Sequence, residues 1–211
     1  MTKVLRRSAV SFKSKPIQTE VRDGWEVVLE YEAESKGPLL IDLSHRVKWD
    51  VQDADLSHIQ PWGVRIPDSP GECVFQNGFL ISRRNRTQSA CWHLMGDSPN
   101  PPEGTAYTET TDAYLLLALL GRELFPIMEK VCSLDFHTPP RERPCLFQAP
   151  VLHVASQVVL LGGDDDLLAI LLACSRGYGH SIVKGLLHAG AEWGLCPAGE
   201  RAFINPIKEL I

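Results

Sequence analysis

The sequence lacks the residue spacings that mark the commonest metal sites and phosphate-binding loops. Its six cysteines form no CxxC pair and its seven histidines form no HxxH or HxxxH pair, so no metal site is expected. GxGxxG, P-loop and GxSxG motifs are also missing. Their absence removes the usual signals for dinucleotide, nucleoside triphosphate and serine-hydrolase sites. The sequence by itself therefore displays no complete enzyme active site.

An excess of positive charge and long apolar runs are equally absent. The net charge of −5 argues against a nucleic-acid partner or a basic membrane-binding surface. The most apolar stretch, residues 114–120, is too short to span a bilayer. The basic residues 1–7 are followed by no apolar run typical of a signal peptide. We expect a cytoplasmic protein with reduced cysteines and, from its 44% hydrophobic residues, a substantial core.

The sequence does contain a series of apolar segments at strand spacing. Residues 25–31 alternate between apolar and polar side chains, which predicts a half-buried strand. Residues 1–20, which precede it, are expected to form an arm or an edge strand. Residues 39–43 predict a buried strand, and residues 47–51 predict its hairpin partner.

A segment rich in proline and glycine, residues 96–104, divides the sequence near its middle. We therefore predict two halves, residues 1–104 and residues 105–211, that together form one compact unit. Three further elements are expected before the dividing segment: a short helix at 53–59 with Asp53 as its N-cap, and strands at 73–80 and 87–94.

Residues 108–132 admit two interpretations. Helix propensity favours one long helix, whereas the alternative is a buried strand up to Leu120 and a helix from Gly121 to Cys132. The apolar spacing in residues 182–189 predicts an amphipathic helix that ends at Gly190. Strands in antiparallel order with few helices indicate the α+β class. The other elements expected in this half are strands at 151–155 and 157–161, a turn at 162–166 and an apolar run at 167–174.

Several short motifs, taken in order, resemble those of one protein family. Gly24-Trp25, Tyr31 and Asp42-Leu43-Ser44-His45 are similar to the opening of the aminomethyltransferases, the glycine-cleavage T-proteins. Near the other end, residues 194–199 (Gly-Leu-Cys-Pro-Ala-Gly) resemble a second T-protein segment. The residues that serve as family landmarks are Trp25, Tyr31, Asp42, Ser44 and His45.

The second half also resembles the gamma subunit of heterotetrameric sarcosine oxidase, a T-protein relative. The resemblance lies in Leu119-Leu120-Gly121 followed by Cys132-Ser133-Leu134-Asp135, where that subunit has a strand, a glycine and a helix. It therefore favours the strand-then-helix interpretation of residues 108–132. It implies an α+β, T-protein-like fold made of the first two T-protein domains, with the third, barrel-like domain absent.

Departures from the family bear on activity. T-proteins carry an Asp-Asp pair after a Gly-Gly turn that takes part in transfer to tetrahydrofolate, whereas residues 78–84 hold no carboxylate here. The resemblance implies a one-carbon protein with tetrahydrofolate-linked aminomethyl or methyl transfer, or folate binding. Its alternative implication is a non-catalytic subunit or scaffold that binds a partner subunit of an oxidase or transferase. The catalytic residues stay unknown.

Two basic segments are candidate ligand contacts. Arg83, Arg84 and Arg86 form the densest positive cluster, which is either a clamp for a carboxylate or phosphate, such as a folate glutamate tail, or a solvated turn. Arg176 and Tyr178 lie in a glycine-rich stretch before a predicted helix, where backbone N–H groups can receive an anion.

The Asp42–His45 motif invites a different interpretation, a Ser44–His45 nucleophile and base. We reject it because neighbouring residues on a strand point to opposite faces of the sheet. Asp42 and Ser44 are instead expected to fix the end of a strand.

Overall fold

The computed structural model describes residues 5–32, 34, 37–138, 142–162 and 168–210, which form a mixed α+β fold, as predicted. The strands are β1 (Pro16–Arg22), β2 (Trp25–Tyr31), β3 (Leu39–Asp42), β4 (Lys48–Gln52), β5 (Cys73–Gln76), β6 (Phe79–Arg83), β7 (Gln88–His93), β8 (Tyr107–Glu109), β9 (Tyr114–Gly121), β10 (Cys145–Val151), β11 (Val154–Gly162), β12 (Leu168–Ser175) and β13 (Cys196–Ala198). The α-helices are α1 (Leu124–Glu129), α2 (Gly179–Ala189) and α3 (Glu200–Leu210).

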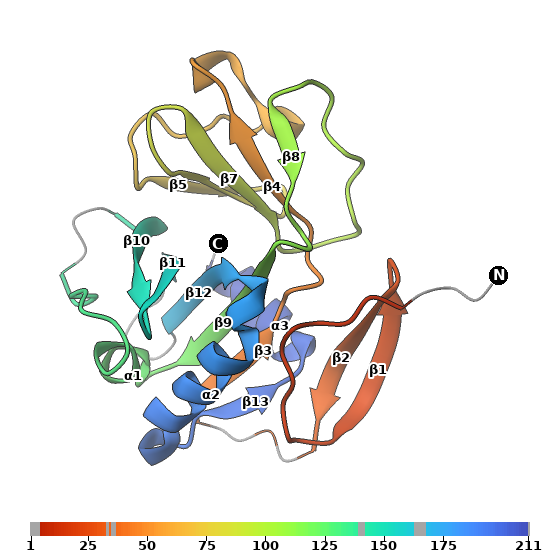
Figure 1. The fold of residues 1–211 in the computed structure, drawn as a ribbon, viewed down its shortest axis with the longest axis vertical. Helices are drawn as coiled ribbons and strands as arrows, with labels where there is room; N and C mark the ends of the chain where they lie inside the picture. Colours follow the sequence, from red (N-terminus) through yellow and green to blue (C-terminus); the bar gives the residue numbers. More distant parts are fainter. Residues whose placement is uncertain (1–4, 33, 35–36, 139–141, 163–167, 211) are drawn as a thin grey trace.

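The described strands form three sheets (Figure 1). One has six strands in the order β10-β11-β12-β9-β3-β13, and one has five strands in the order β5-β6-β7-β4-β8. The third is the β1–β2 hairpin. Among these described pairs only β13 and β3 run parallel, so the fold is mostly antiparallel.

The six-stranded sheet separates two apolar layers. Along β9, successive side chains enter opposite layers, as the pleat of a strand requires. Leu115, Leu117 and Leu119 pack with residues of α1 and α2. Leu116 and Leu120 pack with residues of β6, β7 and α3. Because both faces are covered, this strand is apolar throughout and shows no period-two signal in the sequence.

The strand-then-helix interpretation of residues 108–132 is confirmed. β9 ends at Gly121, and α1 begins three residues later. Gly121 has φ +138°, and a Cβ at this position would lie 2.8 Å from Pro38 Cα, so both the backbone angle and the close packing favour glycine. The amphipathic helix that ends at Gly190 is also confirmed, since α2 has Gly190 as its C-cap.

Two-residue turns correct two predicted strands. The predicted strand at 73–80 is a hairpin whose turn, Asn77-Gly78, has φ +54° and +80°. The predicted strand at 151–155 contains the turn Leu152-His153, with φ +50° and +66°, between β10 and β11. Asn-Gly is the usual sequence for a turn with two positive φ angles, whereas Leu-His gives no such signal.

Two other predictions, both in the first half, were wrong. β4 is not the hairpin partner of β3, because residues 43–47 lead the chain into the five-stranded sheet, where β4 pairs with β7 and β8. The predicted helix at 53–59 is one 3-10 turn at 56–58, and Asp55 rather than Asp53 accepts from its first turn. No element was predicted for the residues after Pro197, which include the eleven-residue helix α3. The predicted turn at 162–166 lies almost wholly outside the described residues.

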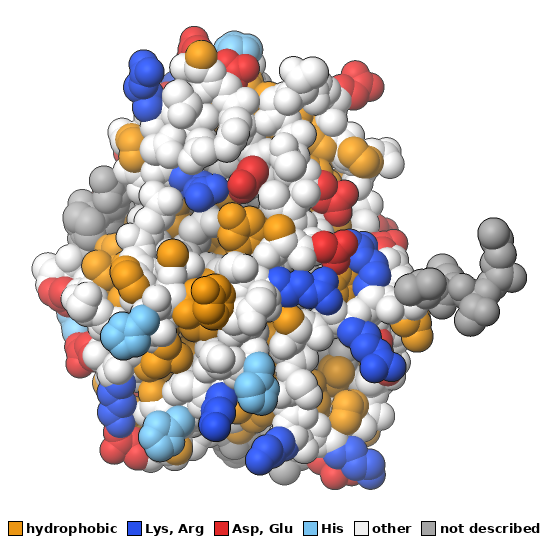
Figure 2. Space-filling model, viewed as in Figure 1, with side chains coloured by type: hydrophobic (Ala, Val, Ile, Leu, Met, Phe, Trp, Pro, Cys, Tyr) orange, Lys and Arg blue, Asp and Glu red, His pale blue; other side chains and the backbone are white. Residues whose placement is uncertain are grey.

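Strands from both predicted halves share the large sheets. β3 pairs with β9, and β8, which follows the segment at 96–104, pairs with β4. The division at residue 104 stays a prediction. Figure 2 shows Lys and Arg side chains interspersed with Asp and Glu over one face rather than gathered into a patch of one sign. No helix in the described part of the chain is long and apolar enough to cross a membrane.

Candidate functional site

The Asp42–Ser44 segment fixes the end of β3, as predicted. Asp42 Oδ1 accepts a hydrogen bond from the Ser44 backbone N–H at 2.9 Å. The Ser44 hydroxyl oxygen accepts from the backbone N–H of Leu116 at 3.2 Å, which ties the turn to β9. Ser44 and His45 lie in this turn rather than on a strand, so the geometric premise of the sequence argument was wrong. Its conclusion holds, because Ser44 is directed at Leu116 while His45 is directed at Glu200.

Glu200, the first residue of α3, gathers three basic side chains. Its carboxylate lies 2.7 Å from His45 Nε2, 2.5 Å from an Arg46 nitrogen and 2.9 Å from Arg22 NH1. The Glu200 side chain is 1% exposed, and burial alone opposes its ionisation. The hydrogen bond and charge of His45, with the charges of Arg46 and Arg22, outweigh that burial and lower the pKa of Glu200 to about 2.

Lys48 lies beneath the same turn. Its side chain is 1% exposed, and Nζ donates to the carbonyl oxygens of Ser44 at 2.8 Å and Arg46 at 2.7 Å. Burial lowers the pKa of Lys48 to about 7, although the charges of Asp42 and Asp112 oppose that shift. The ammonium group therefore holds the backbone that carries His45 and Arg46 toward Glu200.

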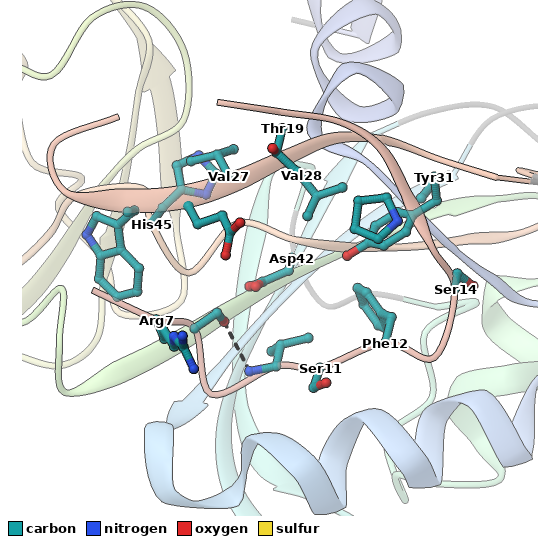
Figure 3. Close-up of a pocket in the computed structure, with 16 residues that line it drawn as sticks. Arg7, Ser11, Phe12, Ser14, Thr19, Val27, Val28, Tyr31, Asp42 and His45 are labelled. Carbon is teal, nitrogen blue, oxygen red and sulfur yellow. Dashed lines mark hydrogen bonds between the residues drawn. The ribbon is translucent and has the colours of Figure 1, made fainter. Parts of the chain in front are cut away.

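A cleft of about 580 Å³ opens beside this turn. The N-terminal arm, residues 5–15, passes between β2 and α2 and forms one wall (Figure 1). Figure 3 shows the Asp42 carboxylate and the Tyr31 hydroxyl pointing into the space between the arm and β2. We call this space the arm cleft. Its lining includes Arg7, Ser8, Ser11, Phe12 and Ser14 from the arm and Trp25, Val27, Tyr31, Asp42 and His45 from the rest of the chain.

Trp25 is buried where the arm meets the body of the protein. The guanidinium groups of Arg6 and Arg176 lie over its ring, 4.8 Å and 5.6 Å from the centroid. Asp112 forms ion pairs with both arginines, and Arg176 also donates to the Arg7 carbonyl oxygen. The predicted anion contact Arg176 thus fastens the arm, and Tyr178, the second predicted contact there, is half-exposed. We call Arg6, Arg176 and Asp112 the arm latch.

The other predicted cluster lies away from the arm cleft. Arg83 is buried and its guanidinium donates to the carbonyl oxygens of Asn85 and Arg86 in its own loop. Arg84 pairs with Asp50 at 3.3 Å, and Arg86 is exposed. The structure therefore brings Trp25, Tyr31, Asp42 and His45 together but keeps the arginines of residues 83–86 apart from them.

The sequence reasoning missed Glu200, Arg46 and Lys48. Lys48 stands in an alternating strand pattern, where a charged residue normally marks the solvent face. Glu200 follows the Pro-Ala-Gly motif directly, at the start of a helix that was not predicted. An acidic residue in a first helical turn is a recognised N-terminal signal and pointed to α3. Within the described ranges, no group of three or more His, Cys, Asp or Glu side chains is arranged to hold a metal ion.

Comparisons with solved structures place the fold in the T-protein-like α+β class. The sequence matches no protein-family model and no curated protein. Similar solved structures include a chain of heterotetrameric sarcosine oxidase from Corynebacterium sp. U-96, in complex with pyrrole 2-carboxylate. The TM-score is 0.62 and the identity 12%, over 78% of this chain and 89% of that one.

A second similar structure is aminomethyltransferase T of the glycine cleavage system from Bartonella henselae. The TM-score is 0.58 and the identity 13%, over 88% of this chain. The match spans 56% of the aminomethyltransferase chain. At these identities the shared property is the fold, and the resemblance drawn from the sequence motifs agrees with it.

Proposed function

We propose that this T-protein-like protein acts in one-carbon metabolism by binding tetrahydrofolate, or a related flat ligand, in the arm cleft. The observation that supports the proposal is the convergence of four family landmarks, Trp25, Tyr31, Asp42 and His45, on that single cleft. These residues lie on two strands and a turn. Packing of the hydrophobic core does not by itself require their side chains to line the same cleft. A cytoplasmic setting fits this role.

The polar groups of the arm cleft suit a pterin-like ring. One Asp42 oxygen is held by Ser44, which leaves the second to accept from the N–H edge of a ring. The Trp25 indole N–H is buried without a partner among the described residues, and it offers a donor for a ring carbonyl. Phe12 and Tyr31, in edge-to-face contact at 5.7 Å, supply aromatic surface beside them.

The proposed function is first of all the binding of the folate. Transfer of a one-carbon group to or from the bound folate is a second step of the same proposal. A T-protein-like protein accelerates transfer mainly by orienting the folate against the one-carbon donor. Glu200 does not fit the role of a proton donor or base near neutral pH, because its contacts with His45, Arg46 and Arg22 outweigh its burial and lower its pKa to about 2. Asp42 and His45, which both line the arm cleft, are the candidate groups to contact a transferred group.

Calorimetric titration with 5-formyltetrahydrofolate tests the proposal. The wild type is expected to bind saturably, and Asp42→Asn to bind about tenfold or more weakly, because a hydrogen bond to a charged group contributes roughly 1.5–3 kcal/mol. Asparagine keeps the oxygen that accepts from Ser44, so the turn is preserved. Asp68→Asn, in an exposed loop, serves as the control and should bind like the wild type. No heat of binding at millimolar ligand would contradict the proposal.

A second candidate function is that of a non-catalytic subunit of an oxidase or transferase assembly. The observation that favours it is the exposed hairpin strand β1, which pairs with β2 alone among the described strands. Ile17 and Val21 on β1 are each 60% exposed. A strand that has one unpaired edge and exposes apolar side chains is a common docking element for another chain.

Native mass measurement of the protein isolated from its own host tests the subunit role. A defined complex with one oxidase or transferase subunit is expected. Ile17→Lys with Val21→Lys should dissociate it without changing the circular dichroism spectrum. Gln76→Lys, on the edge strand of the five-stranded sheet, is the matched control. A monomer as the sole species in the host extract would exclude this function.

A further inference from the structure

A second cleft lies between the two large sheets, away from the arm. It measures about 290 Å³. Arg84, from the connection between β6 and β7, lies on the side of the five-stranded sheet, and β10, β11 and β12 supply the opposite side. We call it the sheet cleft, and its polar lining consists of Arg84, Tyr114, Gln148, Ser156 and Gln157.

Strand register explains why this cleft stays open. Gln148 faces Gln157 across the β10–β11 pair, and Gln157 faces Ala173 across the β11–β12 pair. Directly paired residues place their side chains on the same face of a sheet. Ala173 belongs to the apolar layer between the two large sheets, so the two glutamines face the five-stranded sheet as well. Alanine at positions 155 and 173, on the same face of the sheet, leaves room beside them.

Two polar atoms in this wall have no hydrogen-bond partner among the described residues. They are Gln157 Oε1 and Arg84 Nε, and both are buried. Gln157 as a whole is only 6% exposed. A buried polar atom without a partner costs about 1–3 kcal/mol, so such atoms in native proteins call for an explanation. One is an acceptor and the other a donor, and they line the same cleft.

Two other groups of Arg84, its NH1 nitrogen and its backbone oxygen, form hydrogen bonds that hold the residue in position. Its NH1 donates to Asp50 Oδ2 at 3.3 Å, and its backbone oxygen accepts from Gln148 Nε2 at 2.9 Å. Burial raises the pKa of Asp50, while the Arg84 charge opposes that shift. The Arg84–Asp50 pair brings no net charge to the cleft, so the site favours a neutral or zwitterionic ligand over a simple anion.

We infer that the sheet cleft binds a zwitterion of the size of a small α-amino acid. The ligand's carboxylate accepts from the Arg84 Nε–H group, and its ammonium donates to Gln157 Oε1. Both orphaned atoms then have partners, and the ligand's two opposite charges meet a site that is itself neutral overall. This site and its ligand are independent of the arm cleft and of the folate proposal.

NMR titration of the full chain with glycine and with L-alanine tests this inference. Saturable shifts are expected for backbone amides of β10 to β12 and for the Arg84 Nε–H signal. Acetate and methylammonium, which each carry half of the recognised groups, should bind at least about tenfold more weakly, because each lacks one charge-assisted hydrogen bond.

Variants at position 157 separate recognition from folding. Gln157→Leu keeps the side-chain size, removes the acceptor and should abolish amino-acid binding. Gln157→Glu keeps an acceptor, adds a charge and should bind methylammonium more tightly than the wild type does. Gln76→Leu, on exposed strand β5, should change neither result. Absence of saturable shifts at tens of millimolar amino acid, or equal binding by Gln157→Leu, would overturn the inference.

Discussion

Lys48 keeps an ammonium-bearing side chain in a place that water does not reach. Only two backbone carbonyls, those of Ser44 and Arg46, receive its protons among the described residues. Removing an ammonium group from water costs several kcal/mol unless it is compensated, so burial favours the neutral amine. The residue that supports the Asp42–His45 turn therefore has a pKa near neutral pH.

This burial predicts a pH dependence of stability with a definite sign. The pKa of Lys48 is 10.5 for an unperturbed lysine and about 7 in the folded protein. Between these values the unfolded chain binds a proton that the folded chain does not, so stability rises with pH. The contribution of Lys48 to the slope approaches about 1.4 kcal/mol per pH unit.

Urea denaturation at pH 7.5, 8.5 and 9.5 measures that slope. Lys48→Met should have a slope lower than the wild type by up to that amount, whatever its absolute stability. Lys184→Met, exposed on α2, should keep the wild-type slope. Parallel stability curves for the wild type and Lys48→Met would contradict the assignment.

Glu200 produces a dependence of the same sign in a different range, at acid pH. Its pKa falls from 4.5 to about 2 on folding. The stability that it contributes is complete above pH 4.5 and is lost as the pH falls toward 2, a total of about 3 kcal/mol. Glu200→Gln should flatten the stability curve between pH 6 and 3.5 in thermal or urea unfolding. Glu103→Gln, in an exposed loop, should not. A wild-type acid profile in Glu200→Gln would show that the cations do not stabilise the carboxylate.

Two glycines with positive φ angles, Gly63 and Gly78, lie in turns of the first half of the chain. Gly78, in the turn between β5 and β6, has φ +80°, and a Cβ there would lie 2.5 Å from the Met95 carbonyl oxygen. Gly63 has nearly the same φ, +77°, but no atom lies within 4 Å of its Cβ position. Replacing each glycine by alanine therefore distinguishes the free-energy cost of backbone strain alone, at Gly63, from the cost of strain plus a steric clash, at Gly78.

Alanine at both positions tests that separation. Gly63→Ala should cost roughly 1–2 kcal/mol, the strain of a left-handed conformation. Gly78→Ala should cost at least about 1 kcal/mol more, because the Met95 carbonyl group must also move away from the new methyl group. Urea denaturation gives both values. Equal losses would mean that the Met95 carbonyl shifts without cost.

The same elements show what the sequence was able to predict. Strand β2 was predicted because one face is buried and the other is not, so period two is visible. β9 is buried on both faces and was recovered from the resemblance around Gly121, not from its periodicity. The Leu152-His153 turn was missed because it carries none of the usual turn residues. Helix α3 was missed although Glu200 in its first turn is a recognised helix-start signal.

The candidate site was harder to predict than the fold. Asp42, His45, Trp25 and Tyr31 were recognised as landmarks, but their convergence depends on an arm that is polar and irregular in sequence. Glu200 joins Arg22, His45 and Arg46 from segments more than 150 residues away along the chain, and such pairings leave no local pattern. Local propensity predicts elements, whereas a site assembled from distant segments depends on tertiary packing.

At the scale of the whole molecule, the arm latch joins parts that are distant in sequence. Asp112 precedes β9, Arg176 follows β12, and Arg6 belongs to the arm. Their side chains are between one third and three fifths exposed, so each ion pair contributes no more than about 1 kcal/mol. A latch of that strength holds the arm closed most of the time and still permits opening.

Hydrogen exchange of the Arg6 amide, which donates to the Gly24 carbonyl oxygen at 2.7 Å, reports on this opening. Asp112→Asn should speed that exchange about fivefold, the factor that corresponds to a loss of about 1 kcal/mol, and should leave the buried amides of β9 unchanged. Asp68→Asn, which removes an ion pair of the exposed loop at Arg65, should leave Arg6 as in the wild type. Because the arm walls the cleft, dissociation of a ligand from beneath it should quicken by a similar factor in Asp112→Asn. If the Arg6 amide exchanges at the wild-type rate in that variant, backbone pairing and the packing of Phe12 hold the arm closed without the latch.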